Sequence, residues 1–339
     1  MDNGLVSTIH IKNALVVAPL QVTPVLYMSD GREYDLPPVE LATAGTLDVN
    51  VNDALAQIPP TIHPSEYGSA ELRYEYMNPG HLLASMEIIN LHASLIFNYA
   101  FNAVDEDMPG PHTLEGVWWK HDTAVGGFVA LTNLTGGVLQ VSAQAIDAEG
   151  NRLPPQTFGV LAHSIQMLHL NALTAGLADS ENRAGGLRLK YNGEMGALAV
   201  SGGLVNERRG YSAGIPFWSH DPDSSAPAAI TYGSAGVMIG APDPMMGFPR
   251  STAFTPYTVL RNTTAQSLPV KVTMNYMAEP KPMSLLLPVA PLNPMRPAVS
   301  ICPPCSAHLG WQASKVMRTY FFLSADTRAT CCWPRAASI

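Results

Sequence analysis

The chain has 339 residues, of which 47% are hydrophobic and 14% are charged, and its formal net charge is −8. This apolar content supplies packed cores and excludes a wholly disordered chain, while the acidic balance argues against nucleic acid as a partner. No apolar run approaches the ~18–20 residues that span a membrane. With 29 Pro and 27 Gly, the composition disfavours long helices.

The first predicted elements along the chain are short strands separated by turns. Residues 20–26 place apolar side chains at every second position, which is typical of a strand buried on one face. Ser29-Asp30-Gly31 predicts a hairpin turn, because Asp-Gly tolerates positive φ. Helix signals are weak, and residues 52–56 and 170–173 each predict a single turn. Short strands at this spacing predict antiparallel β-sandwiches.

The same pattern recurs further along the chain. Residues 20–25 (LQVTPV) return as residues 139–144 (LQVSAQ) and again as residues 268–273 (LPVKVT). A period of this kind indicates an array of similar modules rather than one large enzyme fold. An asparagine precedes each copy, and we expect it to serve a turn: Asn13, Asn133 and Asn262.

Further matches set the module boundaries. Residues 72–76 align with residues 187–191, and residues 80–90 run without a gap against residues 196–206. An opening strand at residues 116–119 aligns with residues 236–239 but has no counterpart in the first copy. The third copy stops matching after about residue 288. The sequence therefore predicts a β-sandwich module lacking its first strand (1–101), a complete module (111–217), a truncated module (231–294) and a divergent or disordered tail (295–339).

The predicted tail differs in composition from the rest of the chain. It holds five basic residues against one acid, and all four cysteines: Cys302, Cys305, Cys331 and Cys332. Cys302-Pro303-Pro304-Cys305 has the spacing of a redox or zinc pair. No second well-spaced pair and no βα context accompany it, however. We therefore favour a divergent end, for example one produced by a frameshift, and expect the tail to complete no module.

Two segments combine Trp, His and Asp and form the candidate ligand-binding site. Such groups serve as acid–base pairs or metal ligands, but neighbours along a strand point to opposite faces, so a polar turn is the favoured interpretation. The Trp pair aligns with Met238 and Ile239, which favours core packing over sugar stacking. The candidates are Trp118, Trp119, His121 and Asp122 in one segment and Trp218, His220, Asp221 and Asp223 in the other. We expect no cofactor, no catalytic residue and no metal.

The repeated Asn, the Gly-Arg and Leu-Pro-Pro landmarks near residues 31–38 and 150–155, and the Leu-Arg-x-x-Tyr segments resemble bacterial tandem immunoglobulin-like or fibronectin-type β-sandwich repeats. The lack of a Cys…Trp…Cys core excludes antibody-type domains. The resemblance implies a secreted or cell-surface protein that has a structural, spacer or adhesive role and is not an enzyme. It implies glycans or other surface proteins as partners.

The N-terminal residues 1–5 lack the basic and apolar regions of a signal peptide, which we attribute to a chain that begins inside a module. Two alternatives to a structural array stay open. One is a carbohydrate- or protein-binding module that uses loops and exposed aromatic residues. The other is a hydrolase built around His121 and Asp122 or around His220 and Asp221.

Overall fold

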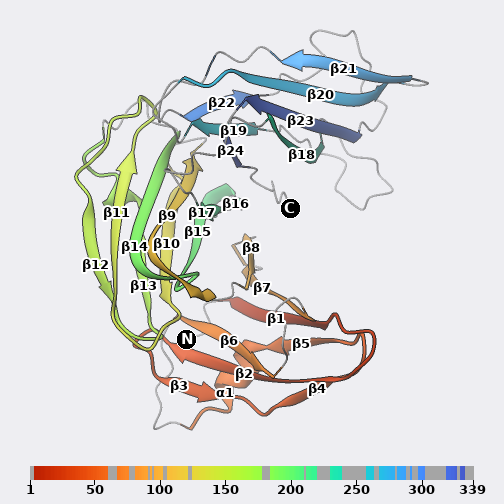
Figure 1. The fold of residues 1–339 in the computed structure, drawn as a ribbon, viewed down its shortest axis with the longest axis vertical. Coiled ribbons are helices and arrows are strands. Elements are labelled where there is room, and N and C mark those ends of the chain that lie inside the picture. The colour runs from red at the N-terminus through yellow and green to blue at the C-terminus, as the bar shows by residue number, and fades with distance from the viewer. Residues whose placement is uncertain are drawn as a thin grey trace.

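The fold consists almost entirely of antiparallel strands (Figure 1). Strands make up most of the residues that the structure describes and helices only a few, so the all-β class predicted from the sequence is confirmed. The structure, a computed structural model, describes residues 4–59, 67–75, 81–90, 92–93, 95–101, 105–120, 124–177, 184–209, 211–219, 230–238, 257–262, 267–278, 281–287, 291, 297–301, 318–326 and 329–332.

The first part of the chain, defined here as β1 to β8, forms two sheets. One sheet has the order β5-β1-β7-β8, with β5 (Thr46–Asn50), β1 (Leu5–Asn13), β7 (Leu82–Asn90) and β8 (Leu95–Ala100). The other is built on the central strand β2 (Leu20–Met28), which pairs with β3 (Glu33–Asp35), β4 (Val39–Leu41) and β6 (Gly68–Tyr74).

Alternating apolar residues hold these two sheets together. Ile9 and Ile11 of β1 lie in one buried cluster with Leu20 and Val22 of β2, as the period of two predicts. The predicted helical turn is confirmed as α1 (Val51–Ala56), where the Asn50 side chain caps the first turn by accepting a hydrogen bond from the backbone of Asp53.

The second part, β9 to β17, has a four-stranded and a five-stranded sheet. The first has the order β13-β10-β15-β16, with β13 (Ile165–His169), β10 (Gly126–Asn133), β15 (Leu198–Asn206) and β16 (Tyr211–Ile215). The second has the order β12-β11-β14-β9-β17, with β12 (Gln156–Val160), β11 (Leu139–Ile146), β14 (Ala184–Met195), β9 (Asp105–Trp119) and β17 (Phe217–Ser219).

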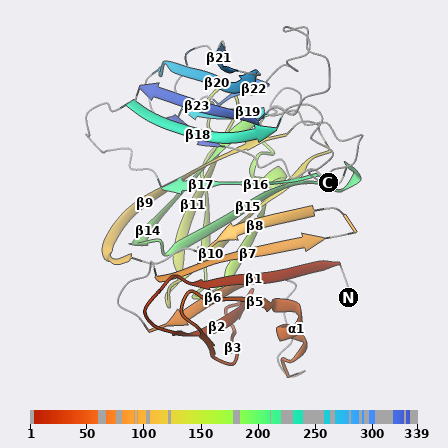
Figure 2. The same cartoon turned by 90° about the vertical axis from the view of Figure 1, so that its right-hand side faces the viewer.

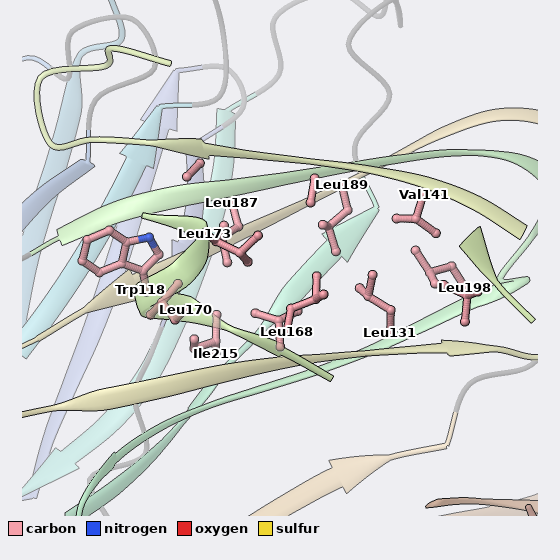
Figure 3. Close-up of a cluster of buried hydrophobic side chains, with 14 of the residues drawn as sticks. Trp118, Leu131, Val141, Leu168, Leu170, Leu173, Leu187, Leu189, Leu198 and Ile215 are labelled. Atoms are coloured by element: carbon pink, nitrogen blue, oxygen red, sulfur yellow. The ribbon is translucent and has the colours of Figure 1, made fainter. Parts of the chain in front are cut away.

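A single core lies between these two sheets. Val141, Leu187 and Leu189 point from one sheet toward Leu131 and Leu198 of the other (Figure 3). The predicted turn at residues 170–173 is confirmed as α2 (Leu170–Leu173), which contributes both of its leucines to this core. A 3-10 turn (Glu207–Arg209) connects β15 to β16.

The third part, β18 to β24, again has two sheets. One has the order β18-β23-β20-β21, with β18 (Ile230–Met238), β23 (Arg318–Asp326), β20 (Val270–Ala278) and β21 (Lys281–Leu287). The other has the order β22-β19-β24, with β22 (Pro297–Ile301), β19 (Tyr257–Asn262) and β24 (Ala329–Cys332).

The prediction of an irregular C-terminal tail is wrong for these strands. Strand β23 lies between β18 and β20, and β24 pairs with β19. The physical reason is that strand pairing needs an extended backbone of the right length and not the Leu-Arg-x-x-Tyr sequence that the other copies share. Cys331 and Cys332 belong to β24, whereas Cys302 and Cys305 lie outside the described residues.

Strand pairing around the repeated asparagine is the same in all three parts. Asn13 pairs with Leu82, Asn133 pairs with Leu198, and Asn262 pairs with Ala329. The first two pairs confirm the gapless match between residues 80–90 and 196–206. Each of the three asparagines is fully buried.

Asn133 shows what this repeated residue does. Its side-chain nitrogen donates hydrogen bonds to the carbonyls of Gly137, Val160 and Leu161, and its oxygen accepts one from the backbone of Thr135. Asn13 makes the corresponding bonds in the first part, to the carbonyls of Ala18, Leu41 and Ala42. The predicted turn role is therefore confirmed for Asn13 and Asn133.

The three parts follow one another along a curved path, from the first part at the bottom of Figure 1 to the third at the top. Figure 2 shows strands β1, β7, β8 and β15 running one above another across the face that spans the first and second parts. The all-β class is therefore confirmed, whereas the finer prediction of sandwich modules remains an interpretation.

Candidate functional site

Both tryptophans of the first candidate segment are buried. Trp118 is 3% exposed and belongs to the core between the two sheets of the second part. Trp119 is 9% exposed and lies on the opposite face of the same strand, as neighbouring residues of a strand must. The prediction of core packing for this pair is confirmed, and neither ring forms an exposed stacking platform.

Trp218 is partly buried and packs with Trp119 in a cluster between the second and third parts. The other members of this cluster are Val117, Ala184 and Val259. The remaining candidates lie outside the described residues, so their grouping stays a prediction: His121, Asp122, His220, Asp221 and Asp223.

The buried face of β9 that carries Val117 and Trp119 also carries a charged residue. Glu115 is 1% exposed and lies opposite Arg188 of β14 in the sheet register. The Nε atom of Arg188 donates a hydrogen bond of 2.5 Å to Glu115 Oε1. A short contact of this kind is typical of a charge-assisted hydrogen bond.

A third charged residue reaches this pair from the third part. Arg261 of β19 is 1% exposed, and its Nη1 lies 2.6 Å from Glu115 Oε2. The same nitrogen donates a hydrogen bond of 2.8 Å to the Gly116 carbonyl. The contact with Oε2 is therefore an ion pair, while the aligned hydrogen bond goes to the backbone. Glu115 thus lies between two guanidinium groups from different parts of the chain.

Glycine makes room for the Arg261 side chain. A Cβ atom at Gly186 of β14 would collide with the Arg261 guanidinium, so only glycine permits this approach. We call Glu115, Arg188 and Arg261 the interface triad. Because burial of charged groups is costly unless they are paired, the triad fixes the second and third parts in one register.

A second junction joins the first and second parts. The Tyr27 ring of β2 stacks on His163 with ring centres 4.9 Å apart, and the Ser29 carbonyl accepts a hydrogen bond from the backbone of Ile165. Further along, Ser212 Oγ of β16 accepts a hydrogen bond from the Ile96 amide of β8 and donates one to the Ile96 carbonyl, both of 2.9 Å. One serine side chain thus links the edges of two sheets.

Tyr27 also belongs to a charged cluster on the sheet of the first part. Its hydroxyl donates a hydrogen bond of 2.5 Å to Glu71 Oε2 and accepts one of 2.6 Å from Arg73. Burial, and then the hydrogen bond to Glu71, raise the pKa of Tyr27 above its ordinary value. The hydrogen bond to Glu33 likewise raises the pKa of Arg73, so both groups stay protonated at any physiological pH.

The described residues contain no group of three or more His, Cys, Asp or Glu side chains that could hold a metal ion. Within the same residues, no helix has the length and apolar character needed to cross a membrane. No family model and no curated protein matches this chain.

Sequence reasoning missed the interface triad. Glu115 follows Leu114, and Arg188 lies between two leucines, and a charged residue beside apolar ones is a signal of a buried pair. Nothing in the local sequence of Arg261, however, indicates that it pairs with a carboxylate of another part of the chain.

Proposed function

We propose that the chain is a non-enzymatic structural array of β-sandwich modules that serves as a spacer or adhesive element of a secreted or cell-surface protein. The observation that carries this proposal is the burial of Arg261 of the third part against Glu115 of the second. A spacer must hold its modules in a fixed geometry, and a buried ion pair between modules has that effect.

The sandwich interpretation is supported by the cores. In the second part, leucines of two different sheets meet in one buried cluster (Figure 3). In the first part, the cluster around Ile9 and Val22 likewise draws on both sheets. The equivalent pairing of each repeated asparagine supports three copies of one module.

Rigidity is supported at both junctions. The first and second parts meet through ring stacking at Tyr27 and through the Ser212 link, and the second and third parts meet through the interface triad. Because these contacts are specific and partly or fully buried, free swivelling of the parts would break them. The cell-surface or secreted location rests on the resemblance to bacterial tandem repeats alone.

A distance measurement tests the spacer proposal. Spin labels carried by non-canonical amino acids are placed at two exposed positions, Val17 in the first part and Leu286 in the third. We expect a single narrow distance distribution. Its width should equal that of a control pair within the first part, Val17 and Leu83. A distribution much broader than the control would show swivelling parts and would contradict a rigid array.

A further inference from the structure

Strand β12 forms an outer edge of the second part. The five-stranded sheet begins with it, and among the described residues β12 pairs with β11 alone. Figure 1 shows β12 along the outer side of the second part, at the left of the view. One side of its backbone is therefore open to a further strand.

The equivalent edges of the other two parts are protected against such pairing. Strands β3 and β4, which pair with the equivalent strand β2, have only three residues each and carry Glu33, Asp35 and Glu40. Strand β21, which pairs with the equivalent strand β20, begins with Lys281 and Pro282. Short strands, charge and proline all hinder pairing with another chain. Strand β12 has five consecutive residues and contains neither a charge nor a proline.

The edge at β12 also leaves apolar surface uncovered. Phe158 is only partly buried, although it packs against the core of the second part. Leu161, directly after the strand, is 56% exposed, and Val138, which lies beside Gly159, is 59% exposed. An additional strand along β12 would cover part of this surface.

The sequence of β12 is complementary to itself. When two copies of β12 run antiparallel about a twofold axis at Phe158, each Phe158 faces its counterpart. Thr157 then faces Gly159 of the second copy, and Gln156 faces Val160 of the second copy. The aromatic pair is of a kind that stabilises neighbouring strands, and no like charges oppose each other. Because Gly159 has no side chain, it leaves room for Thr157.

The residues next to β12 fit the same register. Leu161 faces Pro155 of the second copy, which gives its exposed side chain an apolar contact. Pro155 has no N–H to donate at this position. The Leu161 carbonyl needs none, because it already accepts hydrogen bonds from the Asn133 side chain and from Ser164. Proline at this position therefore leaves no carbonyl of the second copy without a donor.

We propose that two copies of this chain associate through their β12 edges into one continuous antiparallel sheet, with Phe158 on the twofold axis and Thr157 opposite Gly159 of the second copy. Such an isologous contact uses the same surface of both copies and closes as a dimer. The dimer joins two arrays side by side, which goes beyond the spacer function proposed for one chain.

Paired charges test the proposal on the full chain. In light-scattering mass measurements, we expect the wild type to have twice the 36.3 kDa of one chain. The double variant Thr157→Asp/Gly159→Asp places like charges opposite each other in the dimer, and so does Thr157→Lys/Gly159→Lys, so each alone should be monomeric. An equimolar mixture of the two variants pairs opposite charges and should form a heterodimer. Within one chain, a side chain at Gly159 meets only the side chains of Gln140 and Val138, so both variants should fold.

A matched control and a local readout complete the test. Gln140→Asp/Ser142→Asp adds the same charges directly opposite Gly159 and Thr157, but on β11, which is already paired on both sides, so this variant should remain dimeric. Hydrogen exchange should show concentration-dependent protection of residues 156–160. A monomeric wild type, dimeric Asp or Lys variants, or a mixture of folded variants that fails to associate would overturn the proposal. A dimer that protects another segment instead would overturn it as well.

Discussion

The Arg261 guanidinium of β19 and the Glu115 carboxylate of β9 form an ion pair of 2.6 Å in which both side chains are 1% exposed. They come from two different sheets in two different parts of the chain. Arg188 holds the other carboxylate oxygen, and the Gly116 carbonyl accepts a further hydrogen bond from Arg261. The junction between the second and third parts is therefore held by charge as well as by apolar contact.

We expect Glu115→Gln to destabilise the protein by about 3–5 kcal/mol, because it leaves the buried guanidinium of Arg261 and the largely buried one of Arg188 without their shared carboxylate. Chemical denaturation followed by circular dichroism measures the effect. Glu40→Gln is the matched control, since Glu40 is exposed and should change stability by no more than about 0.5 kcal/mol. Equal stability of the two variants would show that the triad does not hold the junction.

The repeated asparagine gives a second stability prediction. Asn133→Ala removes the donor for three carbonyls and the acceptor for Thr135. Buried groups left without a partner cost about 1–3 kcal/mol each, so the melting temperature should fall clearly. Asn98→Ala, at an exposed strand position, is the control and should leave the melting temperature nearly unchanged. An unchanged melting temperature for Asn133→Ala would show that the hydrogen bonds of its side chain do not stabilise the fold.

Local patterns predicted those elements that depend on local sequence. The period of two predicted β2, the repeat of that pattern predicted β11 and β20, and both short helices fall where weak helix signals placed them. The match of Leu82 with Leu198 is confirmed, because each leucine pairs with the repeated asparagine. The sequence predicts these features because burial of one face of a strand makes apolar and polar residues alternate along it.

Features that depend on contacts between distant segments could not be predicted from the sequence. The match of Leu72 with Leu187 is wrong by two residues: in the register Leu72 corresponds to Leu189. A shift of two keeps the same face of a strand, so the apolar pattern alone cannot detect it. The role of Arg261 and the sheet pairing of β23 and β24 were missed for a related reason, since only their partners in space define these roles.

We expect a tyrosine whose hydroxyl is buried, Tyr99, to make the protein less stable at alkaline pH. The Tyr99 hydroxyl is buried and finds no hydrogen-bond partner among the described residues, and burial raises its pKa above the ordinary value of about 10. The folded state therefore holds its proton more tightly than the unfolded state. The free energy of unfolding is therefore at its full value below pH ~10. It falls as the pH rises above that value, because the unfolded state releases this proton before the folded state does.

Tyr99→Phe should remove this loss, so its free energy of unfolding should fall less steeply than that of the wild type above pH ~10. The variant should also be somewhat more stable at neutral pH, because it no longer buries an unpaired hydroxyl. Denaturant titrations between pH 7 and pH ~11 measure both effects. Tyr67→Phe, at an exposed position, is the control. Parallel pH curves for Tyr99→Phe and the wild type would contradict the prediction.

Removal of residues 295–339 should unfold the third part of the chain. This segment contains β23, which pairs with both β18 and β20, and also β22 and β24, which flank β19. Without them, β18 loses its sheet partner and β19 loses both neighbours, so open edges are left that favour aggregation. Because β19 carries Arg261, the interface triad should be lost together with them. We therefore expect the shortened chain to be less stable than the wild type in thermal melts and to show faster hydrogen exchange in residues 257–262. A shortened chain with wild-type protection of β19 would show that these strands do not complete the third part.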